Sequence, residues 1–141
     1  MYQARQGNIG LGKAIEYFTS HSIAVCIPLN DTQKYDLVVD IDGQLARVSV
    51  KTSRFKQNKS SYYVLLKNCG GSSGKGKIRP FDNKSCEYVF VLTGDDKLYL
   101  IPSCEIAAKG AICIGDKYSK YEVFCKKFSE IEFENENQDA E

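Results

Sequence analysis

The chain has 141 residues, of which 43% are hydrophobic, and a formal net charge of +1. This length suits one domain, and the hydrophobic content is enough to build a core, which argues against a disordered protein. The sequence contains no run of about 18 apolar residues, and its first ten residues, MYQARQGNIG, lack the apolar stretch of a secretion signal. We therefore expect no membrane span or membrane partner and a cytoplasmic location.

The cysteines do not have the spacing of a zinc site. All six stand apart, at positions 26, 69, 86, 104, 113 and 125, and the single histidine is His21. Without a C-x-x-C pair, a structural zinc site is not indicated. We expect reduced cysteines that act as small apolar residues in strands, which agrees with a cytoplasmic location.

The net charge hides an asymmetry along the chain. Residues 130–141 hold six acidic residues and no basic one, whereas residues 47–84 hold ten basic residues and one acidic residue, Asp82. Such a basic block is typical of a surface that binds a polyanion, although a solvated face with a flexible loop would have the same composition. We expect residues 1–128 to form a single domain and residues 129–141 to form an acidic, flexible tail.

The first expected element is a helix at residues 8–20. Leu11, Ile15 and Phe18 recur at helical spacing and would form one apolar stripe. Asn8 is a suitable N-cap, while two glycines weaken the first turn.

The rest of the chain is predicted to be mainly strands. We expect strands at 23–27, 35–41, 44–52, 61–67, 87–93, 97–101 and 111–114, a mobile basic loop at 68–79 and a short helix at 103–109. Residues 117–128 have no clear pattern. This order indicates an α+β domain or an α/β domain with a mixed sheet.

The segment YDLVVDIDGQLARVSVKTSR, residues 35–54, predicts a β-hairpin. Asp42-Gly43 is a strong two-residue turn signal, and it would place Ile41 opposite Gln44. Continuing this register brings Asp36 opposite Ser49, with their Cβ atoms about 5 Å apart.

Lys51 lies two residues beyond Ser49 and therefore projects from the same face of the sheet. Asp36, Ser49 and Lys51 should thus share one patch, while Leu37, Val48 and Val50 point into the core.

This patch suits phosphodiester cleavage. The carboxylate of Asp36 is an oxygen ligand of the kind that Mg²⁺ prefers, and Lys51 can orient a water molecule or stabilise charge on the phosphate. The alternative is an ordinary cross-strand ion pair on the surface, which would contribute little to stability.

The sequence resembles the PD-(D/E)XK nuclease superfamily, in particular the branch of bacterial homing endonucleases associated with group I introns. The matching pieces are RQGNIG, IPL followed by YDLVVD, RVSVKTSR and LYLIPSCEI, which together span most of residues 5–121. The resemblance implies a restriction-endonuclease-like α/β fold, with a central mixed sheet of about four strands and flanking helices. It also implies a Mg²⁺-dependent, site-specific endonuclease that cuts both strands of DNA and assembles as a homodimer or homotetramer.

The resemblance also implies roles for individual residues. Asp36 matches the metal-binding aspartate, Lys51 the catalytic lysine, and Val50 would offer its backbone carbonyl to the metal. Ser49 departs from the acidic residue or glutamine that the family has at this place. Leu11 stands where a helix glutamate is usual, and Glu16 is the candidate to replace it.

The expected DNA-binding residues come from the basic block. They are Arg54, Lys56, Lys59, Lys75, Lys77 and Arg79. Two alternatives remain open: a Holliday junction resolvase or restriction-type nuclease, and a catalytically weakened version of the fold that only binds DNA.

Overall fold

The central element of the fold is a six-stranded mixed β-sheet. The structure, a computed structural model, describes residues 2–69 and 78–133. The strand order is β1-β2-β3-β8-β9-β11, and the central strands β3 and β8 are parallel while all other neighbours are antiparallel. The bounds of these strands are β1 Ala24–Cys26, β2 Leu37–Ile41, β3 Gln44–Ser53, β8 Tyr88–Thr93, β9 Leu98–Pro102 and β11 Glu122–Val123. The expected mixed-sheet α/β class is confirmed.

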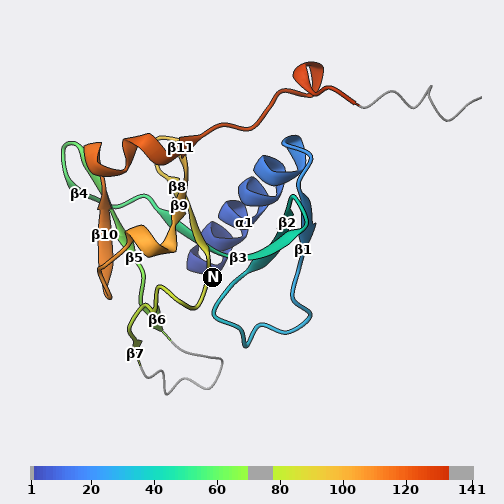
Figure 1. The fold of residues 1–141 in the computed structure, drawn as a ribbon. Coiled ribbons are helices and arrows are strands. Elements are labelled where there is room, and N and C mark those ends of the chain that lie inside the picture. Colours follow the sequence, from blue (N-terminus) through green and yellow to red (C-terminus); the bar gives the residue numbers. More distant parts are fainter. Residues whose placement is uncertain (1, 70–77, 134–141) are drawn as a thin grey trace, which may run out of the picture.

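Helix α1, Tyr2–Ser20, covers one face of this sheet (Figure 1). The helix begins six residues before the predicted start, so Asn8 lies inside it and is not its N-cap. At Gly10 the helix approaches β3 so closely that an added Cβ would overlap the Thr52 methyl group and lie 3.4 Å from Val50 Cγ1. Packing on the sheet therefore outweighs the low helix propensity of the glycines.

Alternation along the central strands divides the core into two layers. Tyr88, Phe90 and Leu92 of β8 pack in the cluster under α1, whereas Val89 and Val91 pack in a second cluster on the opposite face.

A second, three-stranded sheet covers that opposite face, where the resemblance implied helices. Its strand order is β10-β5-β4, with bounds Ala111–Ile114, Ser61–Leu65 and Lys56–Asn58. Within the described residues α1 is the one α-helix, and the other helical segments are short 3₁₀ turns: η1 Ser103–Glu105, η2 Asp116–Tyr121 and η3 Phe128–Glu130. The expected short helix at 103–109 is thus reduced to η1.

The segment predicted to be a basic loop starts and ends in two short paired strands, β6 Asn68–Cys69 and β7 Ile78–Arg79. Lys75 and Lys77, two expected DNA-binding residues, lie outside the described residues.

The expectation that the cysteines act as small apolar residues holds for only part of the set. Five of the six cysteines are free thiols: Cys86 is buried, Cys125 is half-buried, and Cys26, Cys104 and Cys113 are exposed. No helix in the described ranges is both long and apolar enough to cross a membrane.

Candidate active site

The β2–β3 hairpin has the predicted turn and register. Asp42 and Gly43 both have positive φ angles, 52° and 86°, as a tight two-residue turn requires. Leu37 pairs with Val48 at the far end of the ladder. The hairpin therefore pairs YDLVVD with RVSVKTSR in the register that the sequence predicted for the candidate site.

Asp36 lies immediately before the first residue of β2. Its backbone N–H donates to the Val48 carbonyl at 2.9 Å, and its Oδ2 accepts a hydrogen bond from the Val50 N–H at 2.7 Å. The carboxylate therefore takes the place of a backbone acceptor at the point where β2 leaves β3. Asp36 is exposed, so a ligand can reach this carboxylate.

Ser49 and Lys51 lie on one face of the central sheet. They pair with Val89 and Val91 of the parallel strand β8, which pack in the cluster away from α1. Ser49 is buried, with 4% of its surface exposed, and Lys51 is half-buried. Since Leu37 packs under α1, alternation along the strand directs Asp36 toward the face of Ser49 and Lys51.

The oxygen atoms at this point suit a hard divalent cation. The N–H and C=O groups of one residue point to the same edge of a strand, so the Val50 carbonyl lies on the edge that faces Asp36. Among the described residues no group of three or more His, Cys, Asp and Glu side chains gathers to hold a metal ion. A hard divalent cation bound here would thus use the Asp36 carboxylate and the Val50 carbonyl, with water molecules completing an all-oxygen set.

The structure places Glu16 in a different setting. Leu11 is partly buried against the core under α1, while Glu16 is exposed and forms an ion pair with Lys13 at 3.5 Å. Glu16 also lies beside Cys125, where burial and then the Glu16 charge raise the pKa of the thiol. Neither position supplies a second carboxylate to the hairpin.

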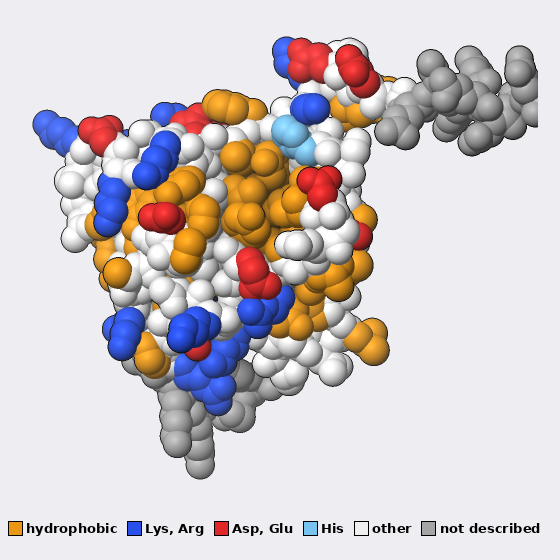
Figure 2. Space-filling model, in the orientation of Figure 1, with side chains coloured by type: hydrophobic (Ala, Val, Ile, Leu, Met, Phe, Trp, Pro, Cys, Tyr) orange, Lys and Arg blue, Asp and Glu red, His pale blue; other side chains and the backbone are white. Residues whose placement is uncertain are grey.

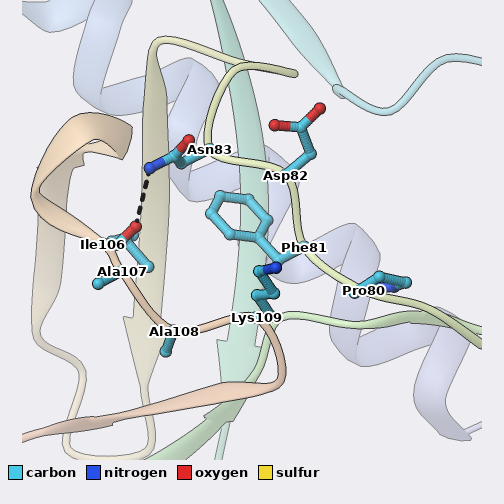
Figure 3. A pocket seen from close by; sticks show the side chains of 8 residues that line it. All are labelled: Pro80, Phe81, Asp82, Asn83, Ile106, Ala107, Ala108 and Lys109. Atoms are coloured by element: carbon cyan, nitrogen blue, oxygen red, sulfur yellow. Dashed lines mark hydrogen bonds between the residues drawn. The ribbon is translucent and has the colours of Figure 1, made fainter.

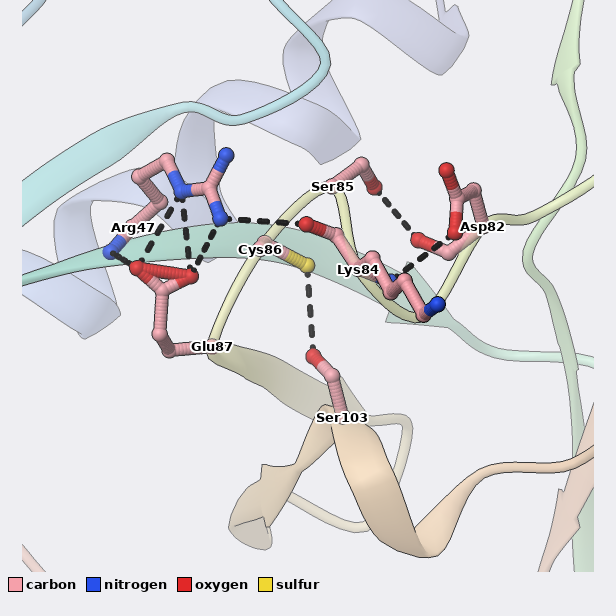
Figure 4. A network of polar contacts seen from close by, with 7 residues as sticks. All are labelled: Arg47, Asp82, Lys84, Ser85, Cys86, Glu87 and Ser103. Atoms are coloured by element: carbon pink, nitrogen blue, oxygen red, sulfur yellow. Dashed lines mark hydrogen bonds and ion pairs between the residues drawn. The ribbon is translucent and has the colours of Figure 1, made fainter.

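Arg47 is a structural residue next to the candidate site that was not predicted from the sequence. Its guanidinium donates to both oxygens of Glu87, with the shortest distance 2.8 Å, and to the Lys84 carbonyl at 3.0 Å (Figure 4). These hydrogen bonds from Arg47 lower the pKa of the Glu87 carboxyl. The network joins the segment before β8 to Arg47 of β3, which lies two residues before Ser49. In the sequence Arg47 is visible only as a basic residue in a strand, because its partner Glu87 lies far along the chain.

Two hollows lie near these segments. One, of about 330 Å³, includes Tyr35 and Arg47 in its lining and therefore adjoins Asp36. The other, of about 240 Å³, lies between residues 80–83 and 106–109, where the Asn83 amide donates to the Ile106 carbonyl at 3.2 Å (Figure 3). Alanine, proline and phenylalanine side chains form much of the second hollow, so we interpret it as a packing feature.

The described DNA-binding candidates lie on several elements. Arg54 follows β3, Lys56 lies on β4 with its ammonium group 5.3 Å from the centre of the Tyr62 ring, Lys59 is in the β4–β5 turn, and Arg79 ends β7. All four are exposed. Figure 2 shows a group of Lys and Arg side chains at the end of the molecule where β6 and β7 lie.

Comparison with known proteins gives two findings that agree with this architecture. A solved structure described as that of a bacterial homing endonuclease, I-Ssp6803I, is similar with a TM-score of 0.68 and 22% sequence identity over 89% of this chain and 84% of that chain, which shows a shared fold. A search of curated proteins found no match. Residues 1–114 match the family described as PD-(D/E)XK endonuclease, and the chain therefore belongs to that family, as the sequence predicted.

Proposed function

We propose that this endonuclease cuts both strands of duplex DNA at specific sites with Mg²⁺, in the manner of an intron-homing enzyme. The observation that carries the proposal is the hydrogen bond between Asp36 Oδ2 and the Val50 N–H, 2.7 Å long, with Lys51 next along β3. This bond orients one oxygen of the only carboxylate among Asp36, Ser49 and Lys51, and the exposed carboxylate can bind a cation.

Each residue of the motif has a distinct proposed role. Asp36 and the Val50 carbonyl bind the metal, and Lys51 stabilises negative charge on the phosphate or orients the attacking water. Ser49 is short and neutral, so its hydroxyl would reach the metal through a water molecule. A bound Mg²⁺ would polarise the scissile phosphate and lower the pKa of a water ligand.

We further propose that the protein works as a homodimer or homotetramer in the cytoplasm. Two cuts in a duplex need two active sites, which a two-fold axis supplies. The chain beyond β11 runs away from the body of the protein (Figure 1), and on it Phe124, Phe128 and Phe133 are 70%, 81% and 67% exposed. A second copy of this chain would bury these rings, and the free thiols of the described cysteines suit a reducing compartment.

Selection of cleaved sequences from a random duplex library tests the proposal. With Mg²⁺ the wild-type protein should enrich a defined site, and a palindromic site would indicate two-fold symmetry. Lys51→Ala and Asp36→Ala should abolish the enrichment. An absence of cleavage of any duplex, with a metal bound away from Asp36, would refute the proposal.

A junction resolvase or restriction-type nuclease is the second candidate, because it would use the same hairpin. The two functions are distinguished by measuring which DNA is cut when a four-way junction and a linear duplex are present in equal amounts. Preference for the junction, without sequence enrichment from the library, would replace the homing assignment.

A further inference from the structure

A groove at the carboxyl ends of β3 and β8 is not part of the hairpin motif. It has a volume of about 530 Å³ and lies between the first turns of α1 and the residues that follow both strands. The residues in its lining that bear on binding are Arg5, Gln6, Ile9, Arg54, Leu92 and Asp96.

The packing of α1 on β3 fixes the position of this groove. Because Gly10 touches Thr52 without an intervening side chain, the preceding turns of α1 extend over the end of β3. Arg5 and Ile9 are four residues apart and therefore lie on one side of the helix, with Gln6 beside them. Two guanidinium groups, one from α1 and one from Arg54, thus line the same groove.

The composition of the groove suits a nucleic-acid backbone. Arginine binds phosphate through paired N–H donors, and an amide such as that of Gln6 adds a further donor. Ile9, which is 60% exposed, and Leu92 supply apolar surface against which a deoxyribose can pack. Asp96 is the acidic residue in this lining, and its charge opposes phosphate binding.

The groove lies close to Lys51 along β3 but on the other face of the sheet. Arg54 is three residues beyond Lys51, which corresponds to about 10 Å along an extended strand. Leu92 of the groove packs in the cluster under α1, whereas Lys51 pairs with Val91 of the opposite cluster, so a phosphate bound in the groove would flank the cut.

We propose that Arg5, Gln6 and Arg54 form a subsite for backbone phosphates that flank the scissile bond. The inference rests on the proposed function, since it takes Lys51 as the position of the cut. The subsite contributes affinity and positions the duplex, and it carries no sequence information.

The test compares single variants in binding to a short labelled duplex of mixed sequence over a series of salt concentrations. Arg5→Ala and Arg54→Ala should each weaken binding about tenfold at low salt and reduce the magnitude of the salt slope by about one. Asp96→Asn should tighten binding. Lys13→Ala is the matched control, because Lys13 is a basic residue of the same helix that pairs with Glu16, and it should bind like wild type.

The position of the contact is tested on the duplex selected from the library. Replacing single phosphates with uncharged methylphosphonates should remove the effect of Arg5→Ala only at one or two phosphates that flank the cut. Thermal unfolding of each variant checks that α1 is intact. If Arg5→Ala and Arg54→Ala both match Lys13→Ala while the wild-type protein binds and cuts, the subsite is refuted and the endonuclease assignment stands. A wild-type protein that neither binds nor cuts any duplex would refute the proposed function itself.

Discussion

The carboxylate of Asp36 accepts a hydrogen bond from the backbone N–H of Val50 at 2.7 Å, across the point where β2 leaves β3. An asparagine at position 36 keeps an oxygen for this bond but loses the charge that would hold a cation. Asp36→Asn should therefore fold normally and lose at least about 100-fold in cleavage rate, a loss typical of removing one electrostatic catalytic group. Asp36→Ala should in addition lose about 1 kcal/mol of stability, because the Val50 N–H loses its acceptor.

Cleavage of the selected duplex and urea unfolding measure the two effects separately. Asp42→Asn is the control, since it changes the same residue type in the same hairpin at a turn position with positive φ, which asparagine tolerates. Wild-type cleavage by Asp36→Asn would remove Asp36 from the catalytic site.

The contact between Gly10 and Thr52 predicts opposite effects of two alanine substitutions in α1. Gly10→Ala would force the Thr52 methyl group to move, and Thr52 is β-branched and lies in the central strand, so we expect a loss of about 1–3 kcal/mol. Gly12→Ala meets no atom within 4 Å and should stabilise the helix by up to about 1 kcal/mol. Thermal unfolding of both variants checks the prediction, and equal effects would mean that α1 does not pack as described.

The two departures from the family pattern predict a gain of activity at a cost in stability. Leu11→Glu combined with Ser49→Gln supplies the side chains that the resemblance implies at these places, so metal-dependent cleavage should become faster. Because Leu11 packs against the core, the glutamate should lower the free energy of unfolding by about 1–3 kcal/mol.

Cleavage rate and unfolding temperature are measured on the same preparations. Ile15→Glu is the matched control, since Ile15 packs in the same cluster one turn further along and should lose stability without gaining activity. Unchanged or slower cleavage by the double variant would show that Leu11 and Ser49 do not limit the rate.

The Arg47–Glu87 pair predicts a stability difference that depends on pH. Hydrogen bonds from Arg47 lower the pKa of Glu87 below its ordinary value of 4.5, so the pair stabilises the fold fully above that pH. Its contribution is lost as the pH falls through the lower pKa of the folded state. Glu87→Gln should therefore cost about 0.5–1 kcal/mol near neutral pH, as expected for an exposed pair, and little in strong acid.

Urea unfolding at several pH values follows this difference, and Glu105→Gln, which alters an exposed glutamate on η1, is the control. If Glu87→Gln still lowers the free energy of unfolding at pH values below the pKa of Glu87 in the folded protein, the loss comes from packing and not from charge.

The exposed rings after β11 predict the assembly state. Phe128 and Phe133 contact each other, with their ring centres 6.0 Å apart, and both are mostly exposed. Replacing both with serine should reduce the mass measured by light scattering to that of a smaller species. Leu45→Ser, which changes an exposed apolar residue in the hairpin turn region, should not alter the mass. An unchanged mass in the double variant would exclude this segment as the interface.

The residues that were predicted well are those whose signal is local. Asp42-Gly43 determines the hairpin register, and apolar runs rich in β-branched and aromatic residues, split by a Gly-Asp-Asp turn, identify β8 and β9. The start of α1 was missed because Gly7, Gly10 and Gly12 disfavour a helix, while the contact with Thr52 is visible only in the folded chain. The three-stranded sheet was missed for the same reason, since β10 pairs with β5 and not with a sequence neighbour.

In the candidate site, the backbone contact of Asp36 was not foreseen. It depends on β2 beginning at Leu37, one residue after the carboxylate. The sequence pattern predicts which side chains share a face, but a strand end is determined by the loop that precedes it.

The parallel pairing of β3 with β8 has a consequence for how the chain reaches its native state. Val48 pairs with Tyr88, so a long intervening segment must be closed before the two central strands meet, whereas β2 and β3 need only their two-residue turn. Local pairings form faster than distant ones, so during synthesis the hairpin can form before β8 has left the ribosome. Asp36 and Lys51 are therefore aligned early in folding. Errors in the later pairing of the distal strands should lower the amount of folded protein more than they alter the activity of the molecules that do fold.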